Sequence, residues 1–185
     1  MNTLSLVHAH LQSWIHAGDF VIDATAGNGK DTEFLCGLVG REGKVLAFDI
    51  QEQAVENTKK RLAEHGWSEV GQVVLDSHAN MGAYAQENSV DCIVFNLGWL
   101  PGGDHTVFTH ADSTIAAIEA GLRLLRKDGV MCVSIYYGGA SGYEERDALL
   151  EYVRTIDPAQ YTVLVTQFAN RAGDPPIPVF IHKAT

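Results

Sequence analysis

Carboxylate and amide side chains stand directly after four short apolar runs of this sequence. They are Asp23, Asp49, Asp76 and Asn96. Such groups accept hydrogen bonds from ribose hydroxyls, amines and the edges of bases. The carboxyl ends of parallel strands meet at one edge of a sheet, so we expect the four groups to surround a shared ligand there. A helix cap can explain any one of them, but capping accounts poorly for all four.

A glycine-rich turn, Thr25-Ala26-Gly27-Asn28-Gly29, follows soon after the first of these runs. Glycine permits a left-handed backbone and lets a ligand approach the main chain closely. The helix predicted to begin here offers N–H groups that have no partner within the helix. A nucleotide-like cofactor is therefore the expected ligand, although Gly-x-Gly alone also occurs in ordinary strand-to-helix turns.

Two adenosine-containing cofactors compete for this pattern. NAD favours a third glycine where this sequence has Thr32, because that glycine allows close helix packing beside the pyrophosphate. S-adenosylmethionine carries no pyrophosphate and needs no third glycine. The acidic end of the first run, Asp23, also suits a cofactor with an amino group and a sulfonium. The residues therefore favour S-adenosylmethionine.

Each strand end can be assigned to a part of that cofactor. Asp49 follows Gly29 by twenty residues, a spacing that places a carboxylate on the ribose hydroxyls. Asp76, Ser77 and His78 are expected beside the adenine. The predicted cofactor-binding residues are Asp23, Thr25, Ala26, Gly27, Asn28, Gly29, Asp31, Thr32, Asp49, Ile50, Gln51, Asp76, Ser77, His78, Asn96 and Leu97.

Apolar periodicity predicts the elements that must position these residues. The predicted strands are 20–24, 44–48, 72–75, 90–95, 130–136, 161–168 and 178–182. The predicted helices are 3–17, 29–39, 51–65, 79–87, 112–126 and 141–156, with Asp112 as one N-cap and a turn at 127–129. Strands that alternate with helices indicate a parallel sheet with helices on both faces. The last two strands leave no room for a helix between them and should pair antiparallel.

Composition narrows the class of protein. The 185 residues suit one α/β domain, 1–185. The chain has 13 basic and 23 acidic residues and a net charge of −10, whereas nucleic-acid-binding proteins usually carry a basic patch. The three cysteines, in apolar segments, are expected to be buried thiols in a reducing compartment, and no metal spacing is present. With neither a signal peptide nor a bilayer-length apolar run, we expect a soluble cytoplasmic protein.

Several stretches together carry a family resemblance that covers nearly the whole chain. They are 22–32, 48–51, 56–58, the block Asn96-Leu97-Gly98-Trp99-Leu100-Pro101-Gly102-Gly103-Asp104, and Pro175-Pro176. The sequence resembles the small bacterial methyltransferase family labelled "putative rRNA methylases". Members are understood to methylate 5-aminomethyl-2-thiouridine at the wobble position of tRNA. The resemblance implies a class I S-adenosylmethionine-dependent methyltransferase fold, Rossmann-like, with a mostly parallel seven-stranded sheet. It also implies a homodimer and the tRNA anticodon region as partner.

Two places depart from the family pattern. Tyr136-Tyr137-Gly138-Gly139 stands where the resemblance implies a Tyr-Pro-Gly-His-like turn, and Gly173 stands where it implies an asparagine. We expect both places to be able to contact the substrate. The substrate is therefore less firmly indicated than the cofactor, and a methyltransferase for a small metabolite or for rRNA, or a nicotinamide-dependent enzyme, stays open.

The chemistry of methyl transfer assigns candidate catalytic residues. The donor methyl is already activated, so the protein mainly orients an amine lone pair along the S–CH₃ axis. Asn96, together with the carbonyl of Leu97, is placed to accept hydrogen bonds from that amine. Trp99 is a candidate to stack on a pyrimidine, although packing under a loop would also explain it. Asp31 or Asp104 would accept the proton or pair with the ammonium form, and the sequence does not decide between them.

Overall fold

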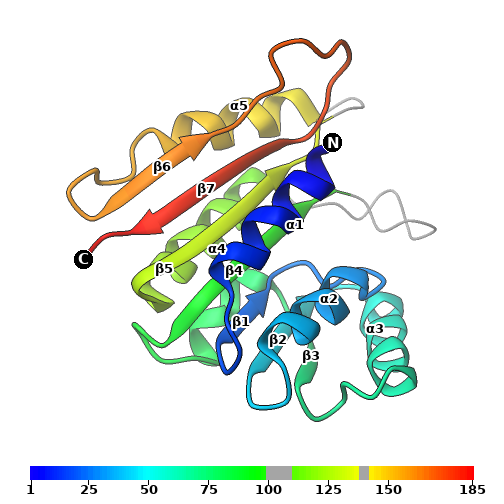
Figure 1. The fold of residues 1–185 in the computed structure, drawn as a ribbon. Coiled ribbons are helices and arrows are strands. Elements are labelled where there is room, and N and C mark those ends of the chain that lie inside the picture. Colours follow the sequence, from blue (N-terminus) through cyan, green and yellow to red (C-terminus); the bar gives the residue numbers. More distant parts are fainter. Residues whose placement is uncertain (99–109, 138–141) are drawn as a thin grey trace.

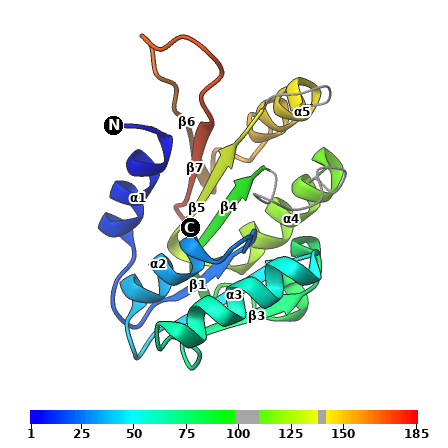
Figure 2. The same cartoon turned by 90° about the vertical axis from the view of Figure 1, so that its right-hand side faces the viewer.

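The computed structural model describes residues 1–98, 110–137 and 142–185. A seven-stranded sheet in the order β3-β2-β1-β4-β5-β7-β6 lies between helices on both faces (Figure 1, Figure 2). The strands are β1 Phe20–Asp23, β2 Lys44–Asp49, β3 Gly71–Leu75, β4 Val90–Leu97, β5 Leu125–Ile135, β6 Tyr161–Val165 and β7 Ile177–Lys183. The helices are α1 Thr3–Trp14, α2 Lys30–Val39, α3 Glu52–Glu64, the 3₁₀ helix η1 His78–Ala83, α4 Ala111–Leu124 and α5 Gly142–Val153.

The strand order changes direction beside β1. Strands β1 to β5 pair parallel, and the chain runs outward from β1 through β2 to β3 before it returns to β4 on the other side of β1. Strand β7 pairs antiparallel with β5 and with β6, so the predicted antiparallel pairing of the last two strands is confirmed. Parallel sheets bind ligands where the order reverses, at the carboxyl ends of the strands. Here that point lies above β1 and β4.

Alternating side chains of the strands fill two separate cores. Val21 and Val45 pack with the buried faces of α1, α2 and α3, whereas Ile22 and Leu46 pack with η1, α4 and α5 on the opposite face. Neighbouring residues of a strand point to opposite sides of the sheet. A parallel sheet covered on both faces therefore needs apolar residues on both, which explains the continuous apolar runs in the sequence.

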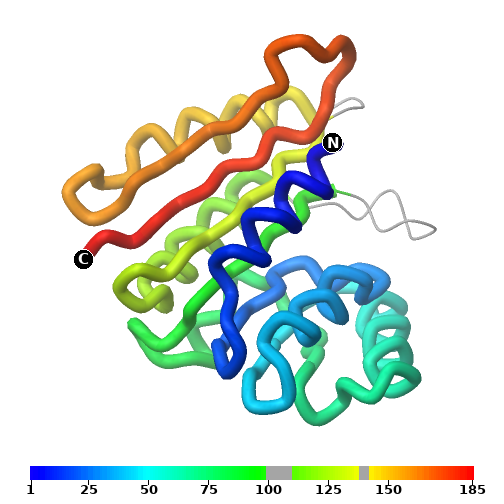
Figure 3. The backbone as a smooth tube through the Cα atoms, viewed as in Figure 1, coloured from blue at the N-terminus to red at the C-terminus, as the bar shows by residue number. Residues whose placement is uncertain are grey.

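Helix α1 lies against the sheet on the same side as α2 (Figure 3). A capping box between Asn2 and Ser5 starts it. The Thr3 hydroxyl donates to the carbonyl oxygen of Pro176 at 3.2 Å, and Trp14 packs edge-on against Phe180 of β7 with ring centroids 5.3 Å apart. These contacts fix the helix at both ends, and its first turn reaches the carboxyl edge of the sheet.

Several predicted boundaries were wrong. The predicted turn at 127–129 lies inside β5, where Asp128 takes a left-handed φ of 65° and the pairing with β4 shifts register between Val90 and Cys92. A bulge therefore absorbs the extra residues. His110, rather than Asp112, is the N-cap of α4.

Other elements are shorter than predicted, because apolar periodicity continues past the last residue of the regular hydrogen-bond pattern. The predicted 79–87 helix is the shorter 3₁₀ helix η1, and α1, α5 and β6 each end early. Ser141, the first residue of the predicted 141–156 helix, lies outside the described ranges.

Two further features of the described residues bear on function. Cys36, Cys92 and Cys132 are free and buried, as predicted. None of the helices in the described ranges combines the length and hydropathy that crossing a bilayer requires.

Candidate active site

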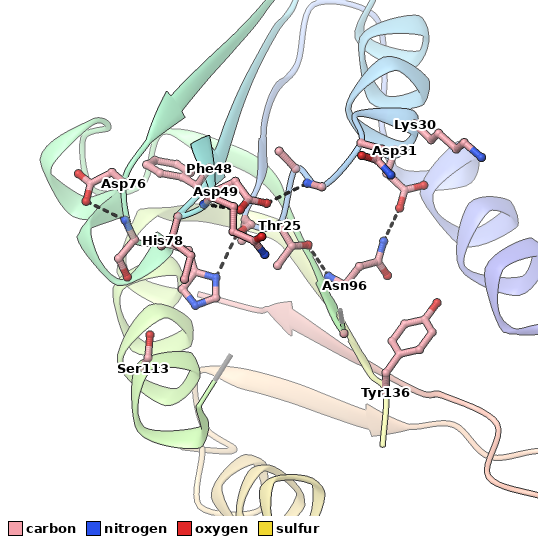
Figure 4. Close-up of a pocket in the computed structure, with 18 of the residues that line it drawn as sticks. Thr25, Lys30, Asp31, Phe48, Asp49, Asp76, His78, Asn96, Ser113 and Tyr136 are labelled. Atoms are coloured by element: carbon pink, nitrogen blue, oxygen red, sulfur yellow. Dashed lines mark hydrogen bonds between the residues drawn. The ribbon is translucent and has the colours of Figure 1, made fainter. Parts of the chain in front are cut away.

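A cavity of about 510 Å³ opens at the carboxyl edge of the sheet, above β1 and β4 (Figure 4). Its volume is in the range of cavities that hold small ligands. Twelve of the predicted site residues line it: Thr25, Ala26, Gly27, Asn28, Asp31, Asp49, Ile50, Gln51, Asp76, Ser77, His78 and Asn96. Most of the residues that line the cavity were therefore among the predicted site residues.

Hydrogen bonds within the glycine turn hold its shape. Ala26 N–H donates to the Phe48 carbonyl at 2.9 Å, and Gly29 N–H donates to the Ala26 carbonyl at 2.9 Å. Gly27 N–H donates to Asp49 Oδ2 at 3.0 Å. These three amides join the turn to β2 and to itself. The turn lines the cavity, but these three N–H groups already donate to acceptors within the protein.

Gly29 is required at its position for two reasons. Its φ is 81°, which side chains rarely adopt, and a Cβ there would stand 2.9 Å from the Cα of Thr58 in α3. The Thr58 hydroxyl in turn donates to the Gly27 carbonyl at 3.0 Å. Gly29 therefore brings α2 and α3 together under the turn and does not line the cavity.

Both oxygens of Asp49 are held by the main chain. Oδ2 accepts from Gly27 N–H and Oδ1 accepts from Gln51 N–H, each at 3.0 Å. An ionised carboxylate has about four acceptor sites, so two hydrogen bonds leave capacity for a ligand. The carboxylate lines the cavity in a fixed orientation, which suits a pair of ribose hydroxyls.

The Asp76 and His78 side chains form the far end of the cavity. Hydrogen bonds from Asn80 and Tyr84 lower the pKa of Asp76, so this carboxylate is ionised. His78 Nδ1 lies 3.0 Å from the Ala24 carbonyl, which can only accept, so Nδ1 carries the proton and Nε2 keeps its lone pair. Burial lowers the pKa of His78 and keeps the ring neutral. This end therefore presents hydrogen-bond acceptors of the kind that an amino group on a purine needs.

A chain of hydrogen bonds joins β1, β4, α2 and α1 on the opposite side of the cavity. Asn96 N–H donates to Thr25 Oγ1 at 2.7 Å. The Asn96 side-chain amide Nδ2 donates to Asp31 Oδ2, and His8 Nε2 donates to Asp31 Oδ1 at 3.0 Å. Figure 4 shows the Asn96 amide nitrogen turned to Asp31 and its oxygen on the side of Tyr136. Asn96 thus offers an acceptor oxygen to the cavity.

Four predicted cofactor residues do not line the cavity: Asp23, Gly29, Thr32 and Leu97. Asp23 is 1% exposed and accepts from Thr32 Oγ1 at 2.6 Å and from Thr25 N–H at 3.1 Å. Burial, with smaller effects of Asp31 and Asp49, raises the pKa of Asp23 to about 7. Asp23 and Thr32 therefore support the glycine turn from behind, whereas Leu97 packs in the core formed with α4 and α5. Trp99 and Asp104 lie outside the described residues.

Helix α1 supplies site residues that sequence reasoning missed. Leu4 lines the cavity, and His8, one turn later, contacts Asp31. Residues four apart share a helix face, so the sequence places Leu4 and His8 together but does not say what that face contacts. Tyr136, Phe48 and Ser113 also line the cavity and were not among the predicted site residues.

Comparisons with known proteins agree with this geometry. A family model described as "Putative rRNA methylase" matches residues 45–182. The chain is 34% identical over 187 residues to the tRNA (mnm(5)s(2)U34)-methyltransferase, chloroplastic, of Arabidopsis thaliana, covering 96% of this chain and 68% of that protein.

Two crystal structures have closely similar folds. One, described as a "putative rRNA-methylase" from Clostridium thermocellum, has a TM-score of 0.95 at 41% identity, covering 99% of this chain and 98% of that one. The other, a methyltransferase from Streptococcus mutans in complex with SAH, has a TM-score of 0.88 at 35% identity with the same coverage. The chain therefore belongs to the rRNA methylase family, and it is an S-adenosylmethionine-dependent methyltransferase.

Proposed function

We propose that this enzyme transfers a methyl group from S-adenosylmethionine to the amine of 5-aminomethyl-2-thiouridine at the wobble position of tRNA. The observation that carries the proposal is the orientation of Asn96, whose amide oxygen lies at the cavity edge while its nitrogen is held by Asp31. A primary amine has hydrogens that such an oxygen can accept. The name of the Arabidopsis relative supports the same acceptor.

The reaction requires an amine lone pair aimed at the methyl carbon. The amine nitrogen forms the new N–CH₃ bond as the S–CH₃ bond breaks, its electron pair stays on sulfur, and the nitrogen sheds a proton. Asn96 Oδ1 would accept one amine N–H and so turn the lone pair toward the donor. Leu97, whose carbonyl is our second predicted acceptor, does not line the cavity, and that carbonyl accepts from Tyr136 N–H at 3.1 Å. Asn96 is therefore the acceptor that we assign to this role.

Asp31 is the candidate carboxylate that the described part of the chain includes. It lines the cavity and contacts both Asn96 and His8. A negative charge there would attract the ammonium form of the substrate before it loses its proton. Because Asp31 holds both the Asn96 amide and the His8 ring, we assign it to electrostatic attraction and positioning. Trp99 as a stacking surface and Asp104 as proton acceptor stay predictions.

Aromatic and basic side chains near the cavity support an RNA substrate. The Arg146 guanidinium lies 4.8 Å from the Tyr137 ring centroid and 4.9 Å from that of Tyr143. Arg171 lies 4.3 Å from the Phe168 ring centroid in the loop before β7. The start of α5 and this loop both lie at the carboxyl end of the sheet (Figure 1). Proteins that recognise single-stranded RNA bases use such stacking groups. Stacking does not require a basic protein, so it is compatible with the net charge of −10.

A cytoplasmic location and a homodimer complete the proposal. The homodimer rests on the resemblance to the bacterial family, and the cytoplasmic location rests on the free, buried cysteines, which suit a reducing compartment. Light scattering on the purified enzyme tests the dimer, with a mass of twice 20.1 kDa as the expected result. A monomer at working concentration would contradict that part of the proposal and leave the methyl transfer untouched.

Methylation of defined RNAs tests the proposed function. Purified enzyme and S-adenosylmethionine are incubated with tRNA from a strain deleted for this gene, and the nucleosides are analysed by mass spectrometry. We expect the aminomethyl nucleoside to gain one methyl group, tRNA without the aminomethyl group to stay unchanged, and binding to weaken steeply as salt rises. Transfer to a free amine metabolite, or to rRNA, with intact tRNA left unmethylated would contradict the proposal. The net charge of −10 makes the small metabolite the first alternative to test.

A further inference from the structure

We propose that His8 is a positioning residue for methyl transfer, which acts through Asp31 to hold the Asn96 amide in its productive orientation. This inference rests on the proposed function, because it concerns the presentation of the acceptor amine. His8 comes from α1, which precedes β1 in the chain. The first helix would then be part of the catalytic apparatus rather than a cover for the sheet.

The His8 ring is fixed in two ways. It stacks on Phe34 of α2, with ring centroids 3.9 Å apart and planes inclined by 13°. Its Nε2 lies 3.0 Å from Asp31 Oδ1, and an ionised carboxylate can only accept, so Nε2 carries the hydrogen. The side chains of His8 and Asp31 are 28% and 25% exposed. A half-buried ring with a set plane is a rigid donor.

Asp31 passes this constraint to Asn96. One carboxylate oxygen is held by His8, so the other is held in a fixed direction, where it accepts from Asn96 Nδ2. An amide rotated by half a turn would place its oxygen against the carboxylate, with lone pair facing lone pair. The contact with Asp31 therefore selects the rotamer in which Asn96 Oδ1 faces the cavity. The hydrogen bond from Asn96 N–H to Thr25 Oγ1 fixes the backbone of Asn96. The orientation of its side-chain amide depends on Asp31.

The packing of α1 against the sheet holds His8 in a fixed position. Val7 and Leu11 on either side of it are 3% and 2% exposed, and the Thr3 hydroxyl joins the start of the helix to Pro176. Leu4, one turn before His8, lines the cavity. Helical spacing of four residues thus brings one wall residue and one positioning residue to the same face.

Three variants test the proposal: His8→Ala, His8→Gln and the control His10→Ala. His10 lies on the same helix but packs against Trp14 and Phe180, away from Asp31. We expect His8→Ala to lower kcat about 10- to 100-fold, the usual cost of losing a residue that orients a reacting group. The KM for S-adenosylmethionine and the affinity for S-adenosylhomocysteine should stay unchanged, and His10→Ala should keep kcat.

The glutamine variant separates positioning from other roles. The Gln amide nitrogen can occupy the place of His Nε2 and donate to Asp31 but cannot take up a proton as imidazole does. We expect His8→Gln to recover most of the lost kcat. An unchanged kcat in His8→Ala, a parallel loss of cofactor affinity, or a folded His8→Gln as slow as His8→Ala would each overturn the proposal.

A second measurement needs no acceptor substrate. The Asn96 side-chain amide is followed by NMR in the complex with S-adenosylhomocysteine, with Asn96→Asp used to assign the signal. We expect His8→Ala to shift that signal and His8→Gln to restore it. An unshifted signal in a folded His8→Ala would overturn the proposal. If the wild-type enzyme fails to methylate tRNA while the signal behaves as expected, the proposed substrate is wrong and the positioning role stands.

Discussion

The two edges of the sheet carry similar charged and polar residues and use them differently. At the amino edge, Asp91 Oδ2 accepts from Phe20 N–H at 2.8 Å and its other oxygen pairs with Arg126. Lys183, 8% exposed, donates to Asn88 Oδ1 at 2.8 Å and to the Leu125 carbonyl at 2.7 Å. Opposite charges and carbonyls thus satisfy each other and close this edge.

At the carboxyl edge the acidic groups are held mostly by donors that carry no charge. Asp49 accepts from two main-chain amides, and Asp76 accepts from the Ser77 amide, the Asn80 side chain and the Tyr84 hydroxyl. Such donors orient a carboxylate without neutralising it. The edge therefore stays negatively charged and open as a cavity. Polar residues stabilise the fold at one edge and line an open cavity at the other.

The largest expected effect is on catalysis at the open edge. Asn96→Ala should lower kcat about 1,000-fold, the upper end of the range for losing a group that stabilises the transition state. The affinity for S-adenosylhomocysteine, measured by calorimetry, should change little. If affinity and kcat fall together, Asn96 belongs to the cofactor pocket and the division between binding and catalysis at this edge is wrong.

The second prediction concerns Asp23, which ends β1 at the carboxyl edge but is buried and does not line the cavity. Its folded pKa of about 7 exceeds the unfolded value, so the folded state binds the extra proton. Stability should therefore fall as pH rises from about 4 to about 7 and level off above that. Asp23→Asn removes this dependence, and its stability relative to the wild type should increase over that range by roughly 2–4 kcal/mol. Urea denaturation at pH 5 and pH 8 measures it; a constant difference between the two proteins would contradict the assignment.

Asp49 tests the binding role of the open edge. Asp49→Ala should weaken the affinity for S-adenosylhomocysteine by about 1.5–3 kcal/mol, the range for a hydrogen bond to a charged group. The matched control is Glu64→Ala, which removes an exposed carboxylate of α3 that pairs with Lys60. An unchanged dissociation constant in Asp49→Ala would rule out a ribose contact.

The smallest expected effect comes from the closed edge. Asp91→Ala leaves Phe20 N–H without its acceptor and Arg126 without its partner, which should cost about 1–2 kcal/mol of unfolding free energy. Denaturant titration measures the loss. The kcat and KM of the folded variant should match the wild type, because Asp91 lies at the other end of β4. A kinetic defect in the folded protein would break the distinction between the two edges.

Sequence reasoning succeeded where the signal is local. Apolar runs that end in Asp49 or Asn96 identify both a strand and the edge at which it ends, because parallel strands share one direction. The same logic placed Asp76 and His78 on the cavity wall. The family resemblance supplied the fold and the cofactor, which the comparisons bear out.

The misses depend on contacts between segments far apart in the chain. Asp31 meets Asn96 across 65 positions and His8 across 23, and no spacing rule brings a helix before the first strand onto the glycine turn. Asp23 was expected to bind the cofactor because it ends β1, but its side chain turns to Thr32. The bulge at Asp128 was read as a turn, since Lys-Asp-Gly is typical of both.

A crystal structure of the enzyme with S-adenosylhomocysteine and an anticodon stem-loop that carries the aminomethyl wobble uridine tests the central claim most directly. The account predicts the ribose hydroxyls on Asp49, and the amine nitrogen within about 3 Å of Asn96 Oδ1 and in line with the sulfur. An amine bound away from Asn96, or a cofactor that does not contact Asp49, would contradict it.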